Sequence, residues 1–584
     1  MLRMLRTIFI GLGILIALGL ALIGPLEARG APLYTGGSVQ PGSYTLLPQF
    51  ETGHASSVLS DTLESVDHHG PTDPAELEAF LDAFIPAQAE TYQIPGTTVA
   101  VVKDGEIFLA KGYGYADTKS RNPVVADKTL FHIGSVTKLL TWTAVMQLVE
   151  QGKLDLYTDV NLYLPPDVQI PDTYAQPVTL HHLMTHTPGF EDRLGNIFRF
   201  GKNDAVPLDT YVAQQMPVRV YPPGKIIGYS NYGAALAGYI IEQVSGMSYE
   251  QYIEENILDP LDMDRSSIRQ PIPPDLADDL ALGHLQTPLG VRPFMEYFPS
   301  APVVGLSATA TDMAKFMIAH LQDGRYKDTQ ILHPATAQLM HQQQFTQDPR
   351  IIGVTYGFVE WERNGQRLLW HGGSTGLFQS TVVLLPEHNL GFFVGCNRKS
   401  AREAGNEFRQ AFLDHYFPFT PPDPQPMLNP ANTADYQARL DRFAGVYKES
   451  RWTYTKSDKL VYAFARLHEI TTDSDGTVPY VVGLNLLGAR YVQVEPLVFQ
   501  EVDGQTTLIF EEDERGNITR AFYDFDPHKV LIKVAWYETR DFHLAVLATC
   551  IIIFLSASVS PTTIRWVGAL NLLYPLGMFI ISLT

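Results

Sequence analysis

Ser135 and Lys138 form the only Ser-x-x-Lys tetrad in this sequence of 584 residues. Residues three apart lie on the same side of a helix, so the lysine nitrogen can reach the serine oxygen. In the first turn of a helix, the backbone N–H of Ser135 can also donate a hydrogen bond to an oxyanion. A serine before an apolar helix is equally a common N-cap, so the tetrad alone leaves a nucleophile and a cap as alternatives.

A second candidate segment, "YPPGKIIGYSNYG", carries Tyr229 and Asn231 on either side of a serine. A tyrosine has an ordinary pKa of about 10, so it acts as a base near neutrality only with help from a cation such as a lysine ammonium. The alternative is that both are turn residues, because Asn and Gly are common in turns.

The third segment is "LLWHGGSTGLFQS", in which His371 precedes two glycines and Ser374. The glycines would allow a substrate to approach the edge of a strand, and the N–H of Ser374 could be a second oxyanion donor. A Gly-Gly bulge beside a surface histidine would give the same pattern.

The overlapping string "GGSTG" also fits the G-x-S-x-G pattern of α/β-hydrolases, with Ser374 as the nucleophile. That elbow requires a helix directly after the serine, whereas "LFQSTVVLLPEHNLGFFV" predicts two strands. Only scattered histidines, such as His388 and His415, follow as partners. An α/β-hydrolase esterase that uses Ser374 is therefore the less favoured interpretation of this segment.

His182 and His186 are four apart on a predicted helix and could face a metal ion, but Leu183 stands where H-E-x-x-H requires glutamate. We interpret them as packing and hydrogen-bonding histidines. The two cysteines, Cys396 and Cys550, provide neither a disulfide framework nor a cysteine-rich metal site. We expect no metal and no cofactor.

These candidates need rigid elements to position them. Apolar residues at helical spacing predict a helix from Ser135 to Gly152, and the segments 178–186, 230–258 and 309–324 predict further helices. A helix capped by Thr72 or Asp73 begins near Pro74. Asp-Gly at 104–105 and Asn-Gly at 364–365 predict β-hairpins. Two β segments therefore enclose a mostly helical middle.

Composition excludes one class of partner. The 42 basic residues against 63 acidic ones give a formal charge of −21, which offers no field for nucleic acid. The uncharged run 7–26 predicts a signal peptide or membrane anchor, and two apolar runs around "PTTIR" predict a transmembrane hairpin. The positive-inside tendency puts Arg3, Arg6 and Arg565 in the cytoplasm and leaves the bulk of the chain outside.

The predicted domains are a signal peptide or N-terminal anchor (1–30), a linker (31–73), the hydrolase domain (74–417), a Pro-rich linker (418–430), a small β-rich domain (431–540) and a transmembrane hairpin (542–584). The role of the β-rich domain is open. One hypothesis is that it borders the mouth of the active site and limits substrate size.

Ser135-Val-Thr-Lys138, Tyr229-Ser-Asn231 and His371-Gly-Gly373 resemble, in this order, the three signature motifs of the serine β-lactamase and penicillin-binding-protein superfamily. The surrounding phrases resemble the branch that contains class C β-lactamases, D-aminopeptidases, related carboxypeptidases and esterases. The resemblance covers about residues 75–417. The small β domain and membrane helices that follow resemble the tails of many bacterial members.

The resemblance implies an α/β fold of the α+β type, in which helices flank an antiparallel sheet and the active site lies between them. Ser135 would attack a carbonyl, Lys138 and Tyr229 would share the proton transfer, and Asn231 would position the substrate. Gly373 would let the substrate approach, and the N–H groups of Ser135 and Ser374 would hold the oxyanion.

The implied activity is that of a serine hydrolase, outside the cytoplasm and anchored to membrane lipid, on an amide, peptide, lactam or ester, which could derive from the cell wall. One departure affects the substrate. Penicillin-recognising members usually have lysine where His371 stands, and histidine is largely neutral near pH 7. The other class of function that stays open is a sensor or scaffold that a ligand acylates once without turnover. The sequence leaves the oligomeric state open.

Overall fold

The computed structural model describes residues 70–559 apart from 194–205, 288–289, 299, 420–439, 457, 460–461, 464–465, 473–477, 483–484 and 503. The chain divides into two units, and all of these residues lie in the second, Leu59–Thr584.

The main sheet is antiparallel, and its strand order is β11-β12-β13-β14-β1-β2-β3. The strands are β1 (Gly96–Lys103), β2 (Glu106–Asp117), β3 (Asn122–Pro123), β11 (Val359–Arg363), β12 (Gln366–Ser374), β13 (Gln379–Leu385) and β14 (Leu390–Cys396). Strands from the two ends of the domain meet at the β1–β14 pair, where Thr97 lies opposite Cys396. Both predicted hairpins are confirmed: Asp104 and Asn364 each adopt positive φ before a glycine that does the same.

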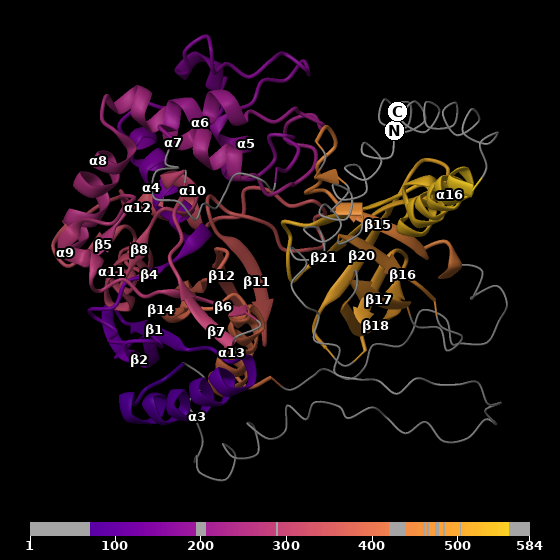
Figure 1. Ribbon diagram of the computed structural model, residues 1–584. Helices are drawn as coiled ribbons and strands as arrows, with labels where there is room; N and C mark the ends of the chain where they lie inside the picture. The colour runs from indigo at the N-terminus through magenta and orange to yellow at the C-terminus, as the bar shows by residue number, and fades with distance from the viewer. Residues whose placement is uncertain are drawn as a thin grey trace, which may run out of the picture. The chain divides into compact units, whose positions relative to one another are not determined.

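Helices cover both faces of this sheet (Figure 1). Successive residues of β1 point to opposite sides, so Val99 and Val101 pack with α3 and α13, whereas Ala100 and Val102 pack with α4 and α11. The second face carries the larger apolar core, which also includes α7. The predicted antiparallel sheet flanked by helices is confirmed.

The helices of this part are α3 (Pro74–Tyr92), α4 (Thr137–Glu150), α5 (Leu180–Met184), α6 (Leu208–Gln215), α7 (Asn231–Ser245), α8 (Tyr249–Ile253), α9 (Pro274–Ala277), α10 (Ala301–Val304), α11 (Ala310–Leu321), α12 (Pro334–His341) and α13 (Ala401–Tyr416). Asp73 caps α3 by accepting a hydrogen bond from the N–H of Ala75, as its position before Pro74 predicts. A short 3₁₀ turn, η1 (Gly134–Val136), leads into α4.

Smaller strands connect the helical layer to the sheet. They are β4 (Phe131–His132), β5 (Ser266–Ser267) and β8 (Ser307–Ala308) in one small sheet, with the pairs β6 (Gly283–Thr287) and β7 (Gly290–Phe294), and β9 (Arg325–Tyr326) and β10 (Thr329–Gln330). Because one residue separates β4 from η1, this small sheet fixes the position of the turn that contains Ser135.

The C-terminal part forms a closed antiparallel barrel. Its strands are β15 (Gly445–Glu449), β16 (Leu467–Ile470), β17 (Val478–Val482), β18 (Asn485–Glu495), β19 (Val498–Glu501), β20 (Thr507–Glu512), β21 (Ile518–Tyr523) and β22 (Val530–Lys533). Aromatic side chains such as Phe443, Tyr447, Phe499 and Phe510 fill an apolar cluster of the barrel. The barrel lies within the range 431–540 that the sequence predicts to be β-rich.

The first apolar run after the barrel forms α16 (Arg540–Val559). Over the residues that the structure describes, no helix meets the length and apolarity needed to cross a membrane. The predicted anchor within 1–30, the linker 31–69, most of the Pro-rich linker and the second apolar run of the hairpin lie outside the described residues.

Candidate active site

Ser135 and Lys138 meet at the start of α4. The 3₁₀ turn η1 contains Ser135, and Lys138 follows in the first turn of the helix. The Nζ atom of Lys138 lies 3.0 Å from the Oγ atom of Ser135 and donates a second hydrogen bond of 3.0 Å to the carbonyl of Val303 in α10. The predicted proximity of serine and lysine is therefore present.

Burial decides the protonation of this lysine. The Lys138 side chain is fully buried, and burial, helped by the nearby Arg451 guanidinium, lowers its pKa well below the ordinary value. A neutral amine can donate to the carbonyl of Val303 and still offer its lone pair to the Ser135 hydroxyl. The pair is thus suited to deprotonate the serine.

The backbone around Ser135 lies directly against the third motif. Gly134 has φ +56, and a Cβ there would lie 2.7 Å from the backbone nitrogen of Ser374. A Cβ on Gly373 would lie 1.9 Å from the carbonyl oxygen of Ile133. Both glycines are required for this close approach. The backbone segments that carry the Ser135 and Ser374 N–H groups therefore lie next to each other.

Tyr229 lies over the same lysine. The Nζ atom of Lys138 is 5.0 Å from the centre of the Tyr229 ring. The His186 ring packs against the Tyr229 ring, and the two ring centres are 4.3 Å apart. Burial raises the pKa of Tyr229 to about 12, while the neighbouring Ser135 hydroxyl and Arg451 guanidinium oppose this shift. The phenol is therefore protonated near neutrality and can give a proton to a leaving group.

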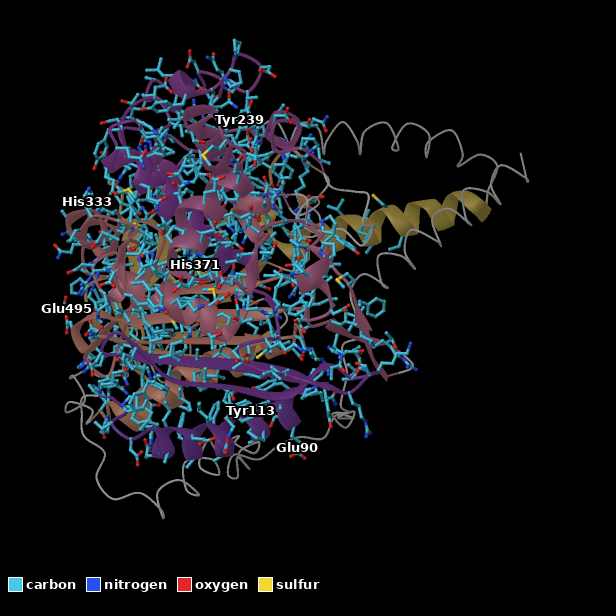
Figure 2. The ribbon with its side chains drawn as sticks, turned by 90° about the vertical axis from the view of Figure 1, so that its left-hand side faces the viewer. Glu90, Tyr113, Tyr239, His333, His371 and Glu495 are labelled. Atoms are coloured by element: carbon cyan, nitrogen blue, oxygen red, sulfur yellow. The ribbon has the colours of Figure 1, made fainter. Side chains whose placement is uncertain are left out.

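Three buried polar atoms of the predicted site have no hydrogen-bond partner among the described residues: the Tyr229 hydroxyl, the Asn231 Oδ1 and the His371 Nε2. Buried polar atoms are almost always paired in folded proteins. These unpaired atoms lie on two of the predicted motifs, and a substrate or water can supply their missing partners. His371 is only 2% exposed, and Figure 2 labels its position.

His371 is neutral. Its Nδ1 lies 2.9 Å from the carbonyl of Gly372, and burial lowers the pKa of the ring to about 3. Donation by Nδ1–H leaves Nε2 as an acceptor. The third motif thus supplies no positive charge at its first position.

The two strands predicted around Ser374 are confirmed: Ser374 ends β12 and the chain returns directly into β13, so the strand–turn–helix of a nucleophile elbow is absent at this serine. One expectation needs correction. His182 and His186 do not share a helix, because α5 ends at Met184 and His186 adopts φ +56. The proline after Thr187 disfavours a longer helix.

His186 instead contacts the second motif, because its Nδ1 accepts a hydrogen bond of 3.2 Å from the backbone N–H of Ser230. His182 is part of the cap of α5, where its Nδ1 accepts a hydrogen bond of 3.1 Å from the N–H of Thr179. Within the described ranges, no three His, Cys, Asp or Glu side chains are grouped so as to hold a metal ion.

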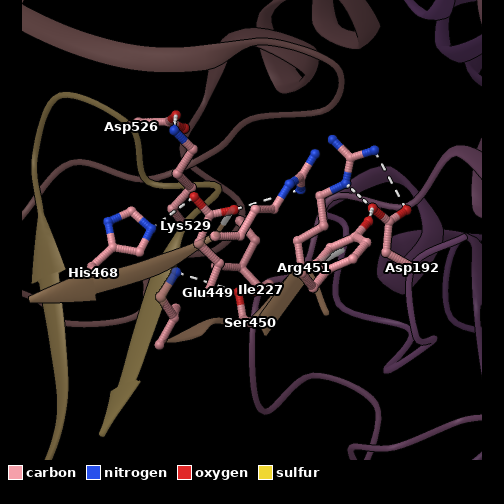
Figure 3. Close-up of polar contacts among 11 residues, drawn as sticks. Asp192, Ile227, Glu449, Ser450, Arg451, His468, Asp526 and Lys529 are labelled. Carbon is pink, nitrogen blue, oxygen red and sulfur yellow. Dashed lines mark hydrogen bonds and ion pairs between the residues drawn. The ribbon is translucent and has the colours of Figure 1, made fainter. Parts of the chain in front are cut away.

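The structure adds residues that the motifs do not indicate. Arg451 lies after β15, and its guanidinium is 5.1 Å from the centre of the Tyr229 ring. His528, before β22, packs against the rings of Tyr229 and His186, each at 5.1 Å. Asp192 binds Arg451 through an ion pair of 2.7 Å (Figure 3). No local pattern reports these contacts, because about 260 positions separate Arg451 from Asp192.

Comparison with known proteins places these observations in a family. The family model described as beta-lactamase matches residues 81–415. Protein flp from Staphylococcus aureus (strain N315) is 28% identical over 331 residues, which cover 55% of this chain and 63% of flp. The chain thus spans less than two thirds of that relative. Penicillin-binding protein 4 from Amycolatopsis lactamdurans is 30% identical over 309 residues, which cover 50% of this chain and 78% of that protein.

Solved structures share the fold. The octameric penicillin-binding protein homologue from Pyrococcus abyssi aligns with a TM-score of 0.50 and 23% identity, over 78% of this chain and 99% of that one. A crystal structure of SurE with D-Leu aligns with a TM-score of 0.53 and 20% identity, over 79% and 100% of the two chains. The likeness extends beyond the residues that the family model matches.

Proposed function

This chain belongs to the beta-lactamase family, and from that premise we propose that it is a serine hydrolase that forms an acyl-enzyme on Ser135. The observation that carries the proposal is the 3.0 Å contact between the Ser135 Oγ and the amine of a fully buried Lys138. Burial lowers the pKa of this lysine, which favours the neutral amine that can act as a base.

In the first step, the Oγ atom of Ser135 bonds to the substrate carbonyl carbon as its proton passes to Lys138. The N–H groups of Ser135 and Ser374 stabilise the oxyanion, and Asn231 and His371 bind the substrate near it. The close approach required by Gly134 and Gly373 supports this role for the two N–H groups.

In the second step, the bond to the leaving group breaks as Tyr229 donates its proton to that group. Lys138, which lies next to Tyr229, then returns a proton to the phenol. Water then attacks the ester on Ser135, with the same residues acting in reverse. The raised pKa of Tyr229 supports its role as proton donor rather than phenolate in the resting state.

The proposed substrates are amides, peptides, lactams or esters, in line with the branch of class C β-lactamases, D-aminopeptidases, carboxypeptidases and esterases. The first position of the third motif is the neutral His371 rather than the lysine of penicillin-recognising members. This difference favours a substrate that is bound in a different way from most penicillins. We propose an extracytoplasmic enzyme anchored to the membrane, with a small molecule or a peptide, including one derived from the cell wall, as its substrate.

The test is turnover by the full-length chain against p-nitrophenyl acetate, a peptide ending in D-Ala-D-Ala, and a fluorescent penicillin. Multiple turnovers of any of the three that vanish in Ser135→Ala support the proposal. A single equivalent of acyl product without further turnover would identify a sensor, and turnover that survives Ser135→Ala would overturn the proposal.

A further inference from the structure

A buried carboxyl group contacts the turn that follows the third motif. Glu296 lies between β7 and α10, and only 1% of it is exposed. Its Oε2 atom accepts a hydrogen bond of 2.6 Å from the Thr375 hydroxyl and one of 3.2 Å from the N–H of Leu377. Both donors belong to the turn between β12 and β13, which begins directly after Ser374. Glu296 therefore binds the segment that carries the second proposed oxyanion donor.

Thr375 connects this carboxyl group to the rest of the turn. Because its hydroxyl proton is donated to Glu296, the hydroxyl oxygen is left as an acceptor. It accepts hydrogen bonds from the N–H of Leu377 at 3.1 Å and from the N–H of Phe378 at 2.7 Å. The N–H of Thr375 donates to the carbonyl of Phe378 at 2.9 Å, which closes the turn. The orientation of the turn backbone thus depends on one carboxyl oxygen.

The same turn packs against the residues that precede Ser135. The Phe378 ring contacts the ring of His132, and the two ring centres are 5.1 Å apart. Phe298, two residues after Glu296, contacts the same histidine ring at 4.9 Å. His132 lies three positions before Ser135. The segments of the two proposed oxyanion donors therefore pack on a shared set of rings.

Gly376 makes room for the carboxyl group inside the turn. A Cβ at this position would overlap the Oε1 atom of Glu296, so an alanine would displace the side chain. The last glycine of "GGSTG" therefore has a different role from the one it would have in a nucleophile elbow. It admits Glu296 to the turn that follows Ser374.

The position of Glu296 is unfavourable for an acidic group. Its Oε1 atom has no hydrogen-bond partner among the described residues. Burial raises the pKa of the group to about 7, although the hydrogen bonds from the turn oppose this shift. An apolar side chain would avoid this cost of burial. The contacts with the turn, rather than stability, therefore explain why a glutamate lies here.

Resting on the proposed function, we propose that Glu296 is a positioning residue, which holds the turn between β12 and β13 so that the N–H of Ser374 points at the oxyanion. In this role Glu296 does not touch the substrate and acts through Thr375 and the turn backbone. Its loss should therefore slow the chemical step more than it weakens substrate binding.

The test measures kcat and KM for p-nitrophenyl acetate, and the Ki of phenylboronic acid, on the full-length chain. Phenylboronic acid becomes tetrahedral when it bonds to a catalytic serine, which places one of its oxygens at the oxyanion position. Glu296→Ala should lower kcat by about 10- to 100-fold and raise Ki by a similar factor, with less than about a threefold change in KM. Glu296→Gln keeps an oxygen that can accept both hydrogen bonds, so it should recover most of the loss.

Asp312→Ala is the matched control. Asp312 is also buried, and it accepts hydrogen bonds from one hydroxyl, that of Ser266, and from one backbone N–H, that of Arg265. Its loss should lower the Tm but leave kcat and Ki within about threefold of wild type. Thr375→Val is the second variant, for the case that Glu296→Ala does not fold. It removes the hydroxyl at nearly constant size and should give the same fall in kcat and rise in Ki.

Two results would overturn the inference. One is an unchanged kcat and Ki in folded Glu296→Ala or in Thr375→Val. The other is equal changes in Glu296→Ala and Asp312→Ala, which would assign Glu296 a role in stability alone. Failure of the proposed function is separate, because the wild-type chain would then not cleave p-nitrophenyl acetate through Ser135.

Discussion

At the scale of single residues, the proposed acylation of Ser135 depends on the protonation state of Lys138. Lys138 is useful as a base only while its amine is neutral, and its complete burial removes the water that would stabilise an ammonium. The neutral form is present above the lowered pKa, so acylation of Ser135 should decline as the pH falls through that value. Tyr229 remains protonated up to a pKa of about 12.

Lys138→Arg tests this dependence. Arginine retains a donor for the carbonyl of Val303 but does not deprotonate, so acylation of Ser135 should slow by about 100- to 10,000-fold. The measurement is the rate of labelling by a fluorophosphonate. Lys111→Arg is the control, because Lys111 pairs with Glu78 and Asp82 away from the site. Equal labelling rates in wild type and Lys138→Arg would contradict the assignment of the base.

At the scale of elements, the site depends on how closely β12 approaches the turn before α4. Gly134 and Gly373 remove the two Cβ atoms that would separate the backbones, and the Ser380 hydroxyl donates to the carbonyl of Ile133 at 2.7 Å. The proposed oxyanion site therefore depends on the packing of two elements, each of which would contribute one N–H group.

Gly134→Ala and Gly152→Ala form a matched pair at the two ends of α4. Both glycines have positive φ, so each alanine should cost about 1–2 kcal/mol of stability. Only the Cβ at 134 meets the backbone of Ser374, whereas nothing lies within 4 Å of the one at 152. We expect kcat/KM to fall by about 100-fold or more in Gly134→Ala alone. Similar activities of the two folded variants, checked by thermal unfolding, would argue against the close approach.

The sequence predicts those elements whose signals are local. Asp73 and Pro74 mark the start of α3, the Asp-Gly and Asn-Gly turns mark two hairpins, and Ser135 marks the entry to α4. The spacing of the histidines does not predict the end of α5 before His186, whereas Pro188 disfavours helix in the residue before it.

At the scale of the whole molecule, two parts of the chain contribute to the candidate site. The helical and sheet part contains Ser135, Lys138 and Tyr229, and Arg451 and His528 from the barrel part contact Tyr229. Contacts across such distances depend on tertiary packing, which neither periodicity nor turn signals encode. The predicted border between the β-rich part and the active site agrees with these contacts, and its effect on substrate size stays a prediction.

Buried histidines give the molecule an acid-sensitive stability. Burial lowers the pKa below 6.5 to about 3 for His132 and His371, and to about 4 for His182, His341 and His528. Since the unfolded chain binds these protons first, each should remove up to about 1.4 kcal/mol per pH unit as the pH falls from 6.5 towards 4. Glu296 and Asp524, with raised pKa values of about 7 and 6, act in the opposite direction but are fewer.

We therefore expect the Tm of the full-length chain to be lower at pH 5 than at pH 7, as measured by calorimetry. His341→Gln, which removes one of these histidines, should flatten the dependence. A Tm that is unchanged or higher at pH 5 would contradict the neutral burial of these rings.

The most direct test of the central claim is the mass of the intact full-length chain after reaction with a fluorophosphonate. The account predicts one added phosphonyl group in wild type and in Ser374→Ala, and none in Ser135→Ala. Labelling that survives Ser135→Ala and disappears in Ser374→Ala would contradict the account and assign the nucleophile to the turn after β12.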